Sequence, residues 1–147
     1  MIEAKQSMTS DDLVDAFQAG AIEGSEFRHE HHVRVAWGLA RRYGREAGLG
    51  RMIAGIREIG ARAGHPEAYH HTITRAWFEL IADAEDLAEG SILFDRKLLS
   101  RYYTRERLSA GRKCWVEPDL HPLSLPAPGP SESAAYSRTE TLRYRRL

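Results

Sequence analysis

The sequence is divided into helical segments by regularly spaced breaking residues, and it carries almost no strand pattern. Apolar residues recur every three or four positions between cap residues and glycines, as in "SDDLVDAFQAG" and "GLGRMIAGIREIGARAG". This pattern predicts an all-α fold. The 147 residues are enough for one compact core and too few for two.

We expect a single-domain bundle of about five helices. The expected ranges are 10–19, 28–43, 49–63, 69–87 and 91–103, and a short sixth helix covers 104–110. Thr9 or Ser10 caps the first helix and Ser91 caps the fifth, because a side-chain oxygen at this position accepts a bond from the first turn. Glycines directly follow the first, second, third and fourth ranges or lie close behind them.

The chain changes character near residue 118, since five of the six prolines follow that point. We expect residues 118–125 to form an extended strap on the domain. Residues 126–147 lack any apolar period and are rich in Ser, Pro and Arg, so we expect a disordered tail. The helical domain is therefore assigned to 1–125. The arginines of the tail are interpreted as solvated, with an RNA- or partner-binding arm as the alternative.

Charge and cysteine content narrow the class of protein. The 21 basic and 21 acidic residues balance, so nothing favours nucleic acid or an anionic membrane as a partner. Cys114 is the single cysteine, which excludes an internal disulfide and a cysteine-based metal site. No segment has the apolar length of a membrane span. We expect a cytoplasmic protein with a small-molecule substrate, and a homodimer stays open.

Five of the seven histidines lie in two short stretches, "HEHH" and "HH", each at the start of an expected helix. On the first of these helices His29 and His32 share the apolar face with Val33, whereas His31 shares the water-facing side with Gly38. On the second, His70 continues the apolar face backward, and His71 lies at its flank.

Topology brings these residues together. Helices joined by short loops favour antiparallel neighbours, so the N-terminal ends of the 28–43 and 69–87 helices meet at one end of the bundle. His29, His32 and His70 then point inward at the same end. The expected 91–103 helix would deliver Tyr102 and Tyr103 there as well.

Three inward imidazoles at one end of a bundle predict a metal site. Neutral imidazole binds divalent transition metals such as Zn, Fe, Cu, Ni or Mn, and three protein ligands leave one position open for chemistry. His71 or Glu30 is the expected fourth ligand or proton acceptor; Glu26 ranks with Glu30 and Glu79 below both. Two alternatives stay open: a metal-free acid–base or binding pocket, and histidines that only satisfy the core.

Three motifs follow one another over residues 27–123: "FRHEHHVRVAW" at 27–37, "YHHTIT" at 69–74 and "LLSRYYTRERL" at 98–108, before "EPDLHPL". They resemble FxHxxHVxxAW, YHxTxT, LLxRYYxxERL and PDLxPL, the motifs of a largely uncharacterised family of small bacterial all-helical proteins. The resemblance implies a helical fold, a site at the same three histidines and a role in natural-product tailoring. The chain departs at His71, where the family pattern has Glu, so His71 replaces that Glu or the activity differs.

The sequence thus favours a metal-dependent enzyme of bacterial biosynthesis, in the lyase, hydrolase, isomerase or oxygenase classes. His29, His32 and His70 would hold an ion that polarises the substrate or activates water or dioxygen. The first alternative is a metal-free isomerase, cyclase or dehydratase that uses His70, His32 and Tyr102 or Tyr103 as acid and base. The second is a non-enzymatic small-molecule-binding module.

Overall fold

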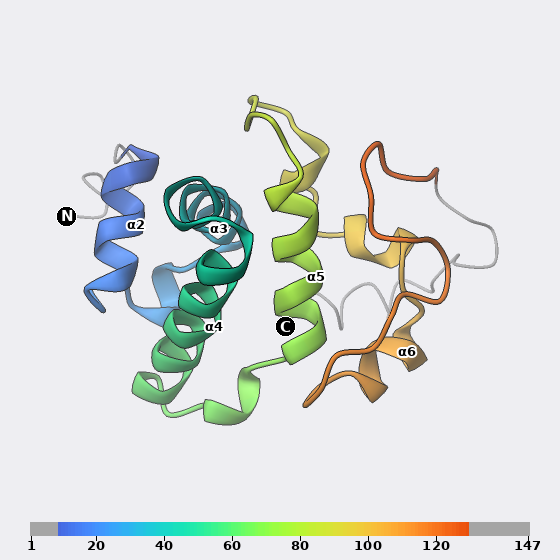
Figure 1. Cartoon of the computed structure of the whole chain (residues 1–147). Coiled ribbons are helices and arrows are strands. Elements are labelled where there is room, and N and C mark those ends of the chain that lie inside the picture. Colours follow the sequence, from blue (N-terminus) through green and yellow to red (C-terminus); the bar gives the residue numbers. More distant parts are fainter. Residues whose placement is uncertain (1–8, 130–147) are drawn as a thin grey trace.

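The computed structural model describes residues 9–129 and shows an all-α domain (Figure 1). The α-helices are α2 (Ser10–Gln18), α3 (His29–Tyr43), α4 (Arg45–Arg62), α5 (His71–Ala82) and α6 (Arg105–Ala110). Four short 3₁₀ turns cover Gly24–Glu26, Pro66–Ala68, Ile92–Phe94 and Leu98–Arg101. This part of the chain has no strand, which confirms the all-α class with about five helices. None of its helices combines the length and the apolar character needed to cross a membrane.

Helix α3 is the central element of the bundle. It contacts α2, α4, α5 and the Ile92–Phe94 turn, and Figure 1 shows it nearly end-on between α2 and α5. Its apolar face is fully buried at Val33, Val35, Ala36 and Leu39. The expected boundaries of this helix are confirmed to within one residue, because the glycine after Tyr43 ends it sharply.

Helices α3 and α4 are joined by a single residue. Gly44 adopts a φ of 85°, a conformation that favours glycine, and the chain reverses there. Helix α4 therefore starts at Arg45, four residues before the expected start. The two helices then approach closely, since a Cβ on Gly48 would lie 2.9 Å from the Leu39 carbonyl oxygen.

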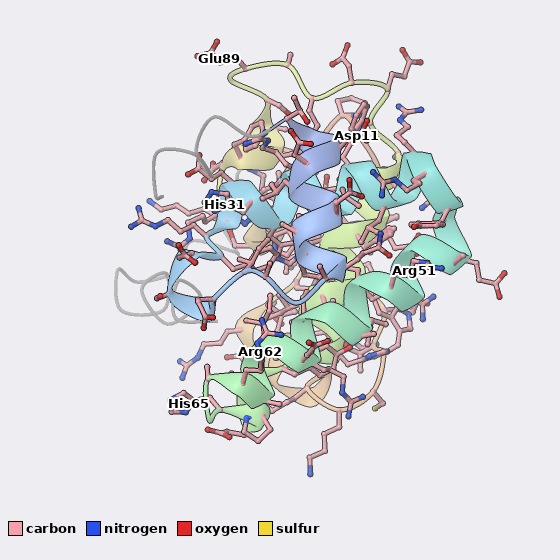
Figure 2. The ribbon with its side chains drawn as sticks, turned by 90° about the vertical axis from the view of Figure 1, so that its left-hand side faces the viewer. Asp11, His31, Arg51, Arg62, His65 and Glu89 are labelled. Carbon is pink, nitrogen blue, oxygen red and sulfur yellow. The ribbon has the colours of Figure 1, made fainter. Side chains whose placement is uncertain are left out.

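Helix α2 covers a face of α3 that the sequence assigns to water. Gly38 is buried, and a Cβ there would lie 2.5 Å from Cγ2 of Val14. Figure 2 shows α2 in front of the bundle, with Asp11 at its upper end. The assignment of Gly38 to the water face is therefore wrong, because a small residue on a polar face lets a second helix pack there.

The expected 91–103 helix is also wrong. This segment forms the two 3₁₀ turns Ile92–Phe94 and Leu98–Arg101 instead. Side chains bind the local backbone in place of helical bonds: Ser91 Oγ accepts from the Leu93 amide and Asp95 Oδ1 from the Lys97 amide. Helix α5 is shorter than expected at both ends, since His70 caps its start and the helix ends at Ala82.

Residues 112–129 form a strap without regular secondary structure, mostly on the side of α5 away from α2 (Figure 1). Two tyrosines hold it: the Tyr102 hydroxyl donates to the Ser124 carbonyl at 2.7 Å, and that of Tyr103 donates to the Val116 carbonyl at 2.8 Å. Residues 126–129 are part of the described strap, and Ala127 packs against the core. The rest of the expected disordered tail, 130–147, lies outside the described residues.

Thr72 fastens this strap to α5. Its side chain is buried, and Oγ1 donates to the Cys114 carbonyl at 3.0 Å and accepts from the Val116 amide at 3.2 Å. A Cβ on Gly111 would lie 2.2 Å from the same oxygen, so the residue just before the strap packs directly on it. One hydroxyl thus satisfies two backbone groups of the strap.

We predict that Thr72→Val destabilises the domain by about 2 kcal/mol, because valine has the same shape but leaves the two backbone groups without a partner, at about 1 kcal/mol each. Urea unfolding followed by circular dichroism measures the change. Ser109→Ala, at an exposed position of α6, is the control and should leave the unfolding free energy unchanged. A loss below about 0.5 kcal/mol in the valine variant would contradict this assignment of Thr72.

Candidate functional site

One pocket of about 540 Å³ lies where the start of α3 meets the start of α5. His29, His32 and His70 all line it, so the structure brings the three predicted histidines together. Its apolar wall is made of Phe27, Ile56, Ile73 and Trp77. The size is that of a site for a small organic molecule.

His70 uses both of its ring nitrogens. Nδ1 accepts from the amide of Ile73 at 3.2 Å and caps α5, and Nε2 lies 2.9 Å from the Leu108 carbonyl oxygen. A carbonyl only accepts, so Nε2 carries the proton and the ring is the neutral Nε2–H tautomer. Burial, with a smaller contribution from Arg112, lowers the pKa of His70 to about 4.

His29 forms a hydrogen bond through one of its two ring nitrogens. Nε2 donates to the Leu93 carbonyl oxygen at 2.9 Å, and the ring meets Trp77 edge-on, with 4.5 Å between ring centroids. The neutral ring therefore keeps its lone pair on Nδ1. Burial lowers the pKa of His29 below its usual value, and the Leu93 carbonyl opposes part of that effect.

His32 differs from both, because its buried Nε2 has no hydrogen-bond partner. The ring stacks on Phe27, with 5.9 Å between centroids, and lies 6.3 Å from the His29 ring. The residue keeps some accessible surface along the pocket, but the Nε2 atom has almost none. Burial, with a smaller repulsion from His29, lowers the pKa of His32 to about 3. A buried polar atom without a partner costs about 1–3 kcal/mol, and a ligand that bonds to it recovers that cost.

Tyr69 also lines the pocket, although the sequence pattern did not predict it as a site residue. Its hydroxyl lies 2.9 Å from Nδ1 of His71, and burial raises its pKa above the usual value. His71 itself does not line the pocket and reaches it through this tyrosine. The sequence feature that points to Tyr69 as a site residue is its position directly before His70 in the "YHHTIT" motif.

The predicted acidic residues lie elsewhere. Glu30 is exposed, with its carboxylate 4.0 Å from Nε2 of His31, and it does not line the pocket. Glu26 belongs to the first 3₁₀ turn, and Glu79 forms an ion pair with Arg45 at 2.8 Å. His31, assigned to the water face, is half-buried and its Nδ1 accepts from the Arg28 amide at the start of α3. None of these carboxylates is in a position to act on a pocket ligand.

Tyr102 and Tyr103 are not brought to the histidines. Both are fully buried, and their hydroxyls hold the strap. The reason is the missing 91–103 helix, since its two turns send these rings to the strap side of α5. Burial raises the pKa of both tyrosines, which keeps the hydroxyls protonated as donors.

A metal fits these three histidines poorly. Over residues 9–129 no group of three His, Cys, Asp or Glu side chains is placed to hold an ion. The physical reason is His70, whose Nδ1 lone pair caps α5 and whose Nε2–H donates to the Leu108 carbonyl. Lone pairs remain only on the rings of His29 and His32, and two nitrogens are fewer than the three ligands of known catalytic zinc sites.

No protein-family profile, curated protein or solved structure matches this chain. The family resemblance of the three motifs therefore stays a prediction.

The depressed pKa values predict acid sensitivity. The unfolded state takes up a proton near pH 6.5, whereas folded His70 does so only near pH 4. The contribution of His70 to stability is therefore constant above about pH 6.5 and falls as the pH drops toward 4, by up to about 1.4 kcal/mol per unit. His32 adds a loss of the same sign that continues toward pH 3.

Urea unfolding at a series of pH values measures this slope. His70→Asn keeps a cap side chain but does not titrate, so its slope should be flatter than that of the wild type. Ser109→Ala, at an exposed position of α6, is the control and should keep the wild-type slope. Equal slopes in His70→Asn and the wild type would contradict a neutral, proton-resistant His70.

Proposed function

We propose that the pocket is the active site of a small-molecule enzyme that moves protons without a protein-bound metal, as isomerases, dehydratases and cyclases do. The observation that carries the proposal is the buried, unpartnered Nε2 of His32, a residue that lines a pocket of ligand size. Because this atom has almost no accessible surface in the empty pocket, it gains a substrate oxygen as its partner when the ring turns toward the pocket. The cost of its burial is then recovered in the complex.

His32 would stabilise negative charge on that oxygen. A pKa of about 3 keeps the ring neutral across the physiological range, so His32 binds as an uncharged hydrogen-bonding group. In the tautomer with hydrogen on Nε2, the ring donates to a carbonyl oxygen and strengthens that bond as the oxygen gains charge.

His29 would be the base. Its lowered pKa leaves it unprotonated at neutral pH, and the Leu93 carbonyl holds its Nε2–H while Nδ1 keeps the lone pair. A proton on the carbon beside the substrate carbonyl moves to Nδ1, and the electron pair of the C–H bond passes to the oxygen held by His32. Return of the proton to a different carbon completes an isomerisation, and loss of a neighbouring hydroxyl as water completes a dehydration.

Tyr69 supplies a further polar contact on the same wall. Its raised pKa keeps the hydroxyl protonated, and His71 fixes its direction through the 2.9 Å contact. We therefore assign His71 a positioning role. The roles first predicted for Tyr102 and Tyr103 as acid and base are not part of the proposal.

The test is proton exchange between carbonyl compounds and D₂O, because this step does not require the full substrate. A panel of ketones and keto acids is incubated with the protein, and deuterium uptake is followed by NMR. We expect His29→Gln to lower the rate by about 100-fold or more, as loss of a general base does, and His32→Gln to lower it at least about tenfold. His65→Gln is the control.

Elemental analysis separates the earlier metal hypothesis from this one. The proposal expects no stoichiometric metal and no effect of chelators on the exchange rate. A transition metal bound at one per chain and lost in His29→Gln, His32→Gln and His70→Gln would overturn it in favour of the metal enzyme. Ligand binding without exchange in any compound would favour a binding module.

A further inference from the structure

The charges along the pocket have one sign. Arg28 and Arg96 line it, together with the neutral histidines, and no acidic side chain is among the lining residues that the structure describes. Both arginines are at exposed positions, so they lie at the mouth, whereas His70 and Trp77 are buried farther in. The apolar wall and the positive mouth together favour a ligand with an apolar body inside the pocket and a negative group at the mouth.

From this arrangement we infer that the pocket binds a small organic molecule with a carboxylate or phosphate group at the mouth and a flat apolar body inside. The inference rests on the proposed function only for the identity of the site. Its own basis is the position of the two guanidinium groups. Arginine pairs with the planar oxygens of a carboxylate or with a phosphate through two parallel hydrogen bonds.

The local field supports the same choice. Arg96 lowers the pKa of His29 more than the nearby carboxylate of Asp95 raises it, so the positive side chain is the stronger of these two charges at the ring. Helix α3 has fifteen residues and begins at His29, and a helix start carries a partial positive charge. The unpartnered Nε2 of His32 lies one turn farther along this helix and is independent evidence that a ligand enters here.

The apolar body is inferred from the inner wall. Phe27, Ile56, Ile73 and Trp77 face a space of about 540 Å³, and the Trp77 ring is already one partner of an edge-on aromatic contact. Flat rings gain most from such walls, because they bury large area and pack edge-on against aromatic side chains. With the anionic group at the mouth, the body of the ligand reaches His29 and His32.

The test measures binding of matched probes by Trp fluorescence and by the imidazole NMR signals of His32. Benzoate and phenyl phosphate carry both a negative charge and an aromatic ring. Benzamide has the ring without the charge, and benzylamine has the ring with a positive charge. Acetate and inorganic phosphate carry the negative charge without a ring. We expect both aromatic anions to bind at least about tenfold more tightly than benzamide and the ring-free anions. The stronger of the two anions identifies carboxylate or phosphate as the group recognised.

Substitutions of the two arginines test where the anionic group binds. Arg28→Gln and Arg96→Gln should each weaken benzoate or phenyl phosphate by about tenfold and leave benzamide unchanged, since only the charged bond is lost. Arg51→Gln is the matched control, and Figure 2 shows Arg51 in the right half of the view, with His31 in the left half. Circular dichroism confirms that each variant is folded.

The outcomes distinguish this inference from the proposed function. Benzamide binding as tightly as benzoate, anion binding that survives both arginine variants, or no probe binding up to about 10 mM overturns the anion preference. Anion binding that depends on the arginines, with exchange activity that survives His29→Gln, supports the inference and removes the proposed function instead.

Discussion

The two hydrogen bonds of the His70 ring join the start of α5 to α6. One bond caps α5, and the other binds the carbonyl of Leu108 within α6. Because the ring is buried and neutral, both bonds require a single tautomer, and this tautomer fixes the position of the α5 start against the strap side of the domain. The pocket lies directly beside this junction, so its wall is set by the same pair of bonds.

This use of His70 divides the three clustered histidines into different roles. One imidazole is a structural cap, one is anchored by a backbone carbonyl, and one has a buried nitrogen without a partner. Such a gradient is typical of a functional site, where a group that destabilises the empty protein is held in place by neighbours whose bonds are complete. The same burial lowers the basicity of the three imidazoles. The rings are therefore neutral in the empty pocket, and a bound ligand can raise their proton affinity.

Charge is separated along the pocket. Neutral imidazoles lie inside and guanidinium groups lie at the mouth, with carboxylates directed outside or paired on other surfaces, as Glu79 is with Arg45. An anionic group bound at the mouth would bring negative charge close to His29 and favour its protonated form. Binding and proton uptake would then support each other, which suits a base whose pKa is depressed in the empty pocket.

The sequence by itself determined the helical class, the boundaries of α3 and the gathering of His29, His32 and His70 at one end, because these follow from the apolar period, the glycine stops and short connections. It could not determine which nitrogens are available, since the Leu93 and Leu108 carbonyls that occupy them come from segments more than thirty positions away. It also missed the burial of Gly38 and the diversion of Tyr102 and Tyr103 to the strap. Those outcomes depend on which helix packs against which face and on local side-chain bonds that replaced the expected 91–103 helix, and only the tertiary structure decided them.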